Sequence, residues 1–135
     1  MNLLPQNTHL GKLDILEVYD YYDLPCLFSC KNLSEHIFLA ILSELTKELA
    51  VWLYVPTSRG RLEDIRSGTI DLHDAFVQSE DGFVYKVIIH DVDNSADTIE
   101  PIFCEDLNQE WLPIAGEFIY FSQEPFLWER VTNIR

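Results

Sequence analysis

The chain has 135 residues, of which 47% are hydrophobic and 13% aromatic, and its formal net charge at pH 7 is −14. A chain of this length and composition can bury a packed core as one domain over residues 1–135, which excludes an intrinsically disordered protein. No apolar run reaches the roughly 18 residues of a membrane span. The negative charge disfavours direct binding to nucleic acid or to an anionic membrane, because both need a basic surface.

The first segment, residues 1–12, contains Pro5, Asn7 and Gly11, which interrupt any regular period, so we expect a loose N-terminal arm. It lacks the basic start and apolar centre of a signal peptide. The chain has three cysteines, which fit free thiols in a reducing compartment. The sequence therefore predicts a cytoplasmic protein.

Two strands are predicted next, over residues 13–22 and 26–30. The first is rich in valine, isoleucine and tyrosine, which favour strands. A turn at residues 23–25 separates the two strands, and a second turn at residues 31–34 leads into the centre of the chain.

The central stretch, residues 35–56, holds two dense apolar runs, 37–42 and 49–55. One interpretation is a helix over residues 35–50, capped by Ser34, because apolar side chains recur there at helical spacing. However, the first run is apolar on every side, and the second is β-branched and aromatic and ends at a proline. Two strands of a hairpin are favoured, and short connections then predict an antiparallel meander.

Two short helices are predicted after the hairpin, over about residues 58–67 and 72–78. Thr57 or Ser58 can cap the first helix, and Gly68 suits the left-handed residue that follows its last turn. Asp71 can cap the second helix.

The remaining elements are a clear strand over residues 83–90, a short edge strand over 98–103, a helical turn over 105–111 and a last strand over 117–122. In the first of these, Phe83, Tyr85, Val87 and Ile89 fall on one face. Residues 119–135 form an aromatic-rich tail. The expected fold class is α+β, with a meander-like curved sheet of about five to six strands and two short helices.

Metal and cofactor sites are not expected. Cys26 and Cys30 share one face of a strand at a spacing of ~13 Å, too far apart to bind one ion. Residues 91–97 resemble the start of a calcium loop, but Ala96 and Ile102 stand where glycine and glutamate are needed. Arg59, Arg61 and Arg66 could form a small anion site, although pairing with neighbouring acids is favoured. Hydrolase, phosphate-binding and dinucleotide motifs are missing from the sequence.

Charge is distributed unevenly. No lysine or arginine lies between Lys86 and Arg130, whereas ten acidic residues do. A basic protein partner is compatible with this charge, since long-range attraction would speed the encounter. Several aromatic side chains of the chain are of types that are enriched at protein interfaces but are equally normal at the edge of a β-rich core, namely Tyr19, Tyr21, Tyr22, Trp52, Tyr54, Trp111 and Trp128. The candidate interaction surface consists of Asp91, Asp93, Asp97, Glu105, Asp106, Glu110, Trp111 and Trp128.

Several segments resemble a family of small bacterial proteins of unknown function that is well represented in cyanobacteria. The resemblance covers about residues 13–116 and implies a bacterial cytosolic or mobile-element setting, with the tail from Ile119 as an addition. Many relatives have glycine at the position of Glu35, so the turn into the central hairpin is expected to differ here. The resemblance implies no catalytic residue. It is carried by residues 14–17, 24–32, 52–58, 61–68 and 70–76.

Three functional hypotheses follow. The leading one is a non-enzymatic protein–protein interaction module, an accessory or regulatory subunit that binds through an acidic, aromatic-bearing surface. The second is an acidic nucleic-acid mimic that inhibits a nucleic-acid-binding complex in a defence or anti-defence setting. The third is a small enzyme whose site is not recognised by motif, using Asp71, His73 and Asp74.

Overall fold

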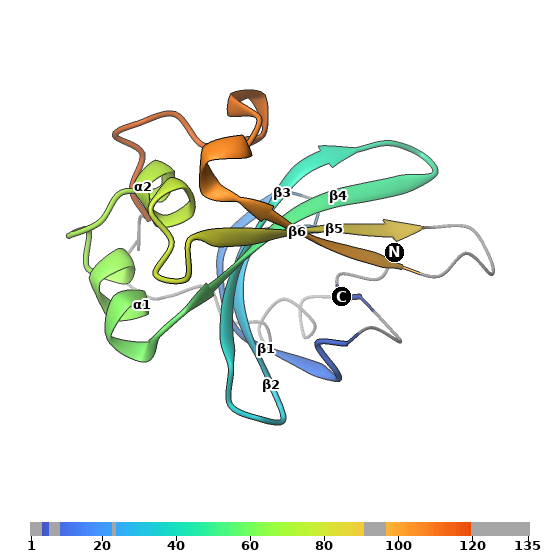
Figure 1. Ribbon diagram of the computed structural model, residues 1–135, viewed down its shortest axis with the longest axis horizontal. Helices are drawn as coiled ribbons and strands as arrows, with labels where there is room; N and C mark the ends of the chain where they lie inside the picture. The colour runs from blue at the N-terminus through green and yellow to red at the C-terminus, as the bar shows by residue number, and fades with distance from the viewer. Residues whose placement is uncertain (1–3, 6–8, 23, 91–96, 120–135) are drawn as a thin grey trace.

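The computed structural model describes residues 4–5, 9–22, 24–90 and 97–119. Its six strands form one antiparallel sheet in the order β1-β2-β3-β4-β5-β6, each paired with its neighbour in sequence (Figure 1). The predicted antiparallel meander with two short helices is thereby confirmed. The elements are β1 (Leu13–Tyr22), β2 (Leu24–Asn32), β3 (Ile37–Leu45), β4 (Leu49–Thr57), α1 (Arg59–Arg66), α2 (Leu72–Val77), β5 (Phe83–His90), β6 (Thr98–Phe103) and the 3-10 turns η1 (Cys104–Asp106) and η2 (Gln109–Trp111).

The central hairpin consists of β3 and β4, so the helix considered for residues 35–50 does not form. The first four residues of β3 and most of β4 are buried on both faces. In β4, Leu53 and Val55 belong to one hydrophobic cluster, whereas Trp52 and Tyr54 belong to the other. This arrangement explains why the apolar run has no polar side, since a strand in the middle of a sheet that is covered on both faces contacts no water.

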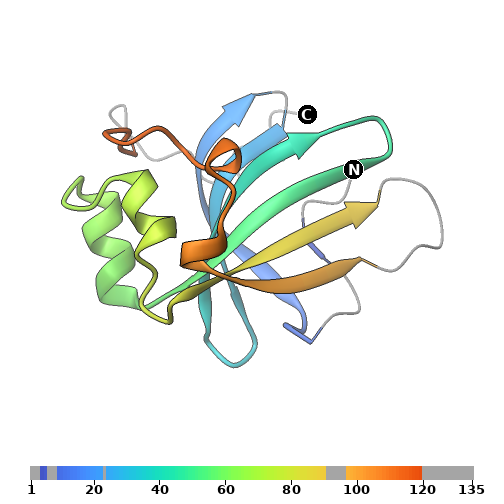
Figure 2. The ribbon, with the colours of Figure 1, turned by 45° about the horizontal axis from the view of Figure 1, so that its top comes forward.

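The sheet is strongly twisted, so that β5 and β6 run across the direction of β1 and β2 (Figure 2). Both helices lie at one end of the sheet. Their buried side chains, including Ile65 and Phe76, join the first cluster together with Leu39 and Leu53. The second cluster fills the opposite face, where Leu10, in the segment before β1, is also buried.

The two helices begin and end where local chemistry dictates. The Ser58 hydroxyl accepts a hydrogen bond from the backbone N–H of Arg61, and Asp71 accepts one from Asp74. Gly68 follows α1 with φ of +84°, a conformation that costs glycine little because it lacks a Cβ. The caps predicted from sequence are therefore confirmed.

The segment after β6 differs from expectation. The helical turn predicted for residues 105–111 is two separate 3-10 turns, with Leu107 buried between them. Residues 117–119 are not part of a strand, so this portion of the last strand predicted for residues 117–122 is wrong. The N–H of Leu72 instead donates to the carbonyl oxygen of Glu117 at 2.7 Å, which fastens the segment to α2. Residues 120–122 lie outside the described part of the chain.

Within the described residues, no helix combines the length and apolar character needed to cross a membrane.

Candidate binding surface

An aromatic cleft opens where β5 and β6 meet the turn between β2 and β3. It consists of two adjoining hollows of about 670 and 350 Å³, which share His9, Phe83 and Tyr85. Phe83 and Tyr85 lie two residues apart on β5 and so point to the same face. The strand register places Phe103 opposite Phe83 and Pro101 opposite Tyr85. These four side chains share one face of the β5–β6 pair.

The rings of the cleft contact one another edge to face. The ring centroids of Phe83 and Tyr85 are 5.1 Å apart, and those of His9 and Tyr85 are 5.7 Å apart. The ring centroids of Phe38, on β3, and Tyr85 are 6.3 Å apart. Because Phe38 belongs to the second hydrophobic cluster, it connects the cleft to that cluster. The cleft is thus the outer end of a packed face. Phe103, at 66% exposure, has most of its ring in water.

Charged side chains surround the aromatic floor. Glu35, Arg59, Glu80 and Asp81 line the larger hollow. The Glu80 carboxylate accepts hydrogen bonds from the backbone N–H and the hydroxyl of Ser58, at 2.8 and 3.0 Å. The Glu80 carboxylate therefore helps to fix the position of Ser58, which caps the start of α1.

Glu35 has φ of +66°, and no other described residue besides glycine has positive φ. Its backbone conformation is the one that glycine adopts most easily. Its carboxylate pairs with Lys31 Nζ at 3.3 Å. The turn before β3 therefore places a charged side chain at the cleft where a glycine would place none.

The acidic residues predicted as an interaction surface are divided by the structure. Glu105, Asp106, Glu110 and Trp111 lie together on η1 and η2, directly after β6. Asp97 directly precedes β6, at the end of this strand opposite to η1 and η2. Its carboxylate accepts a hydrogen bond from the backbone N–H of His90 at 3.2 Å. Asp91, Asp93 and Trp128 lie outside the described residues.

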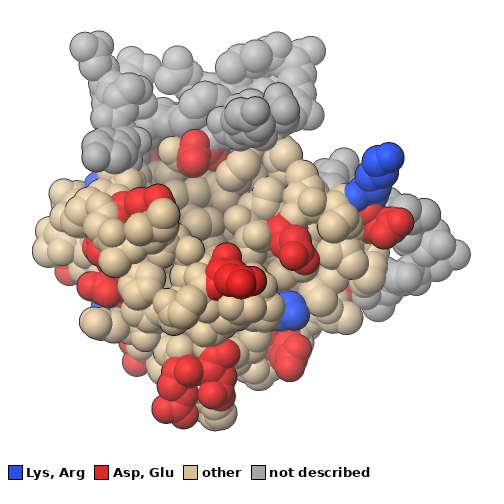
Figure 3. All heavy atoms as spheres, turned by 90° about the horizontal axis from the view of Figure 1, so that it is seen from above, with Lys and Arg blue, Asp and Glu red and all other residues tan. Residues whose placement is uncertain are grey.

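The acidic turns adjoin the aromatic cleft. A third hollow, of about 610 Å³, is lined by both Phe103 and Glu105. Trp111 is half-buried, with Lys86 Nζ 4.6 Å from its ring centroid. Seen from above, the face that carries η1 and η2 shows acidic side chains spread across it and few basic ones (Figure 3). Phe103 therefore lies where the cleft, on the face of the second hydrophobic cluster, meets the acidic turns, which pack against the first.

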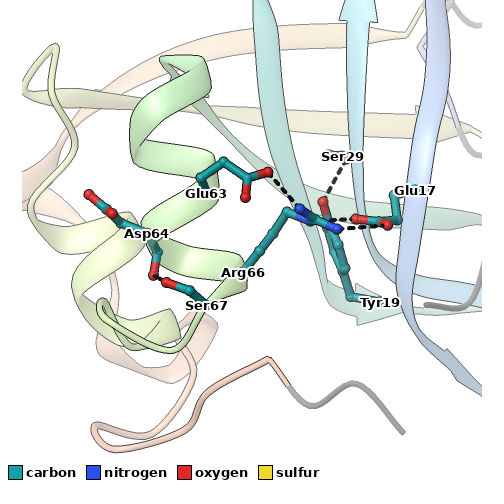
Figure 4. Close-up of polar contacts among 7 residues, drawn as sticks. All are labelled: Glu17, Tyr19, Ser29, Glu63, Asp64, Arg66 and Ser67. Atoms are coloured by element: carbon teal, nitrogen blue, oxygen red, sulfur yellow. Dashed lines mark hydrogen bonds and ion pairs between the residues drawn. The ribbon is translucent and has the colours of Figure 1, made fainter. Parts of the chain in front are cut away.

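Two of the three arginines considered for an anion site have other contacts, and the third, Arg59, lines the larger hollow. Arg66 forms a two-pronged ion pair with Glu17 at 2.7 and 3.1 Å and contacts Glu63 at 2.6 Å (Figure 4). The hydrogen bonds to Glu17 raise the pKa of the Arg66 guanidinium. Arg61 donates to the carbonyl oxygens of Asp74 and Gln78 at the end of α2.

Next to the Arg66 pair, the hydroxyl groups of Tyr19 and Ser29 are 2.9 Å apart in the buried interior. Burial raises the pKa of the Tyr19 phenol, so this group stays neutral. The cluster joins β1 and β2 to α1 and stabilises the fold. No described arginine in it is directed toward an open anion site.

The three residues of the enzyme hypothesis also have structural contacts. Both carboxylate oxygens of Asp71 accept backbone N–H groups, from Asp74 at 2.7 Å and from Gly116 at 2.8 Å. These bonds lower the pKa of Asp71. The His73 ring is 3.4 Å from the amide oxygen of Gln109 and 3.7 Å from the Asp74 carboxylate.

Metal-ligating residues do not gather in the described part of the chain. Cys30 is buried, Cys26 and Cys104 are half-buried, and none of the three forms a disulfide. Burial raises the pKa of the Cys30 thiol. The calcium-like sequence falls almost wholly in residues 91–96, outside the described residues.

Sequence reasoning named Glu105, Asp106, Glu110 and Trp111 as candidates and did not name the residues of the aromatic cleft. The alternation of β5 placed Phe83 and Tyr85 on one face, which was the available signal. It could not show that Phe103 lies opposite Phe83, because that contact depends on the register between two strands.

Comparison with known proteins gives a family but no function. No curated protein and no solved structure shows a significant match to the chain. A family model described as "Family of unknown function (DUF6575)" matches residues 1–124, a range that includes all six strands and both helices. The chain belongs to this family.

Proposed function

We propose that this protein is a non-enzymatic interaction module that binds another protein through the aromatic cleft and the adjoining acidic turns. The observation that carries the proposal is the exposed ring of Phe103, which lines both the smaller hollow of the cleft and the hollow that contains Glu105. An apolar ring in water, set among further aromatic side chains and rimmed by charges, is typical of a protein interaction site.

The composition of the surface supports a protein partner. Aromatic residues are enriched at the centres of protein interfaces, and charged residues surround them at the rim. The cleft follows this pattern, with Phe83, Tyr85 and Phe103 on its floor and Asp81 and Glu105 at its edge. We further propose that the protein acts in the cytoplasm. Its three cysteines form no disulfide, which is typical of proteins in a reducing compartment.

The test is affinity purification of the tagged full-length chain from its own host, with quantitative mass spectrometry. The wild type is compared with Phe103→Ser and with Leu45→Ser. Leu45 is the matched control, because it is 45% exposed and is the last residue of β3, at the end of this strand that lies away from the cleft. Thermal unfolding of all three proteins confirms that each is folded.

We expect a protein recovered in near-stoichiometric amount by the wild type and by Leu45→Ser, and lost with Phe103→Ser. Reciprocal purification with the tag on that protein must recover this chain. Recovery of the same proteins by all three forms would refute the cleft as the binding surface. The nucleic-acid mimic and the enzyme stay predictions from sequence.

A further inference from the structure

We propose that the occupant of the aromatic cleft is a short cationic segment of the partner, with one large apolar side chain flanked by lysine or arginine. This inference rests on the proposed function, since it specifies the chemistry of the partner at the same site. Three features of the surface lead to it: the anchor hollow, the charge of its rim and the blocked edge of β6.

The anchor hollow accounts for the apolar side chain. The smaller hollow, of about 350 Å³, is lined by His9, Phe83, Tyr85, Pro101 and Phe103. Its walls are four apolar or aromatic groups and one imidazole, so a polar side chain entering it would lose water without gaining enough hydrogen bonds. A leucine or aromatic side chain would instead bury apolar area from both partners.

The rim accounts for the positive charge. The residues that line the three adjoining hollows include four carboxylates, those of Glu35, Glu80, Asp81 and Glu105, and one guanidinium, that of Arg59. Asp81 and Glu105 lie at the same end of the floor, because the start of β5 pairs with the end of β6. Lysine or arginine residues next to the anchor would therefore meet Asp81 and Glu105 at that end and the carboxylates of the larger hollow beside it, whereas an acidic segment would be repelled.

The edge of β6 determines how the segment binds. Among the described strands, β6 is an outer one and pairs only with β5. Pro101 occupies its middle and has no N–H to donate. A partner strand cannot form a continuous ladder there. Recognition consequently depends on side chains that enter the cleft, which is why one anchor and its charged neighbours define the segment.

The experiment presents a random peptide library, displayed on phage, to the immobilised full-length protein. Enriched sequences are compared with those selected by Phe103→Ser and by Leu45→Ser. We expect the wild type and Leu45→Ser to enrich peptides that carry a large apolar residue between basic ones. We expect Phe103→Ser to lose them.

The best peptide is then synthesised and titrated against each variant. We expect about tenfold weaker binding to Phe103→Ser, as for loss of a central interface aromatic, and near-unchanged binding to Leu45→Ser. Affinity should fall at least about threefold between about 50 and 300 mM salt, because the charges are exposed. The double variant Asp81→Lys, Glu105→Lys should reject the basic peptide while keeping its thermal stability.

The failures are distinguishable. Enrichment of neutral or acidic peptides that still require Phe103 would overturn the cationic segment but leave the cleft as a binding surface. Selection that yields no Phe103-dependent peptide would overturn the short-segment inference, and the host purification would then decide the proposed function alone. Unaltered binding of the basic peptide by the lysine double variant would overturn the role of the rim.

Discussion

Asp71 is predicted to hold two parts of the structure together, and its replacement by alanine should show this. One carboxylate oxygen accepts the backbone N–H of Asp74 and caps α2, and the other accepts the N–H of Gly116. The neighbouring bond from Leu72 to the carbonyl of Glu117 fastens the same segment. Asp71→Ala removes both carboxylate contacts at once.

The magnitude follows from the two bonds. Loss of an aspartate N-cap costs about 1 kcal/mol. The charge-assisted bond to Gly116 is exposed to solvent, so it contributes only about 1 kcal/mol more to the free energy of unfolding. Asp71→Ala should therefore lower stability by about 2 kcal/mol, and for a chain of this length the melting temperature should fall by about 7 °C.

Asp71→Asn separates the two contributions. Asparagine caps helices about as well as aspartate, but it has one acceptor oxygen instead of two. It should retain the cap and lose the bond to Gly116, at a cost of about 1 kcal/mol. Urea unfolding followed by tryptophan fluorescence measures all three proteins. Hydrogen exchange should show the Gly116 amide becoming unprotected in Asp71→Asn.

The pH dependence has a definite sign. The hydrogen bonds from Asp74 and Gly116 lower the pKa of Asp71 in the folded protein, so the unfolded state takes up a proton first as pH falls. The stabilisation is present above the ordinary carboxyl pKa of about 4 and is lost as pH falls through the folded-state pKa. The stability difference between wild type and Asp71→Ala should therefore shrink on acidification. A difference that stays constant down to about pH 3, or one below about 0.5 kcal/mol at neutral pH, would refute this reasoning.

Further predictions concern the buried contacts and the strained turn. The Glu17–Arg66 pair, whose side chains are only 13% and 26% exposed, should give a coupling energy of about 1–2 kcal/mol in a double-mutant cycle with alanine; a value near zero would contradict it. Glu35→Gly should raise the free energy of unfolding, measured in urea, by about 0.5–1 kcal/mol. Glu35 has a left-handed backbone conformation, which costs most residues about 1–2 kcal/mol but costs glycine little. Glu35→Ala is the control and should bring no gain. Iodoacetamide at about pH 8 should alkylate the Cys30 thiol at least about tenfold more slowly than the Cys104 thiol, as measured by mass spectrometry. Burial raises the pKa of the Cys30 thiol and blocks access of the reagent to it. Equal rates would contradict this prediction and show that the interior of the β-sheet opens readily.

Local chemistry explains which features the sequence alone could predict. Ser58 and Asp71 cap the helices because their side-chain oxygens reach backbone donors two or three residues ahead, which requires no distant partner. The strands were likewise predictable, because β-branched and aromatic runs bounded by turn residues favour extended structure. Short connections then left the meander as the simplest antiparallel order.

Contacts between distant segments explain what the sequence could not predict. The stretch after Ile114 has aromatic side chains typical of a strand, yet Gly116 and Glu117 are fastened to the start of α2, through the Asp71 carboxylate and the Leu72 N–H. The acidic residues Asp97 and Glu105 are close in sequence but lie at opposite ends of β6, because an extended strand separates them by its whole length.

The sequence by itself determined the sheet, its strand order and the helix caps. It also determined that the protein is acidic and rich in aromatic residues. Only the tertiary structure decided which aromatic side chains face water together, because the cleft depends on the register that sets Phe103 beside Phe83 and Pro101 beside Tyr85. Shifting that register by one residue would turn the same side chains to the other face of the sheet. Composition and spacing within a single strand carry no information about this choice.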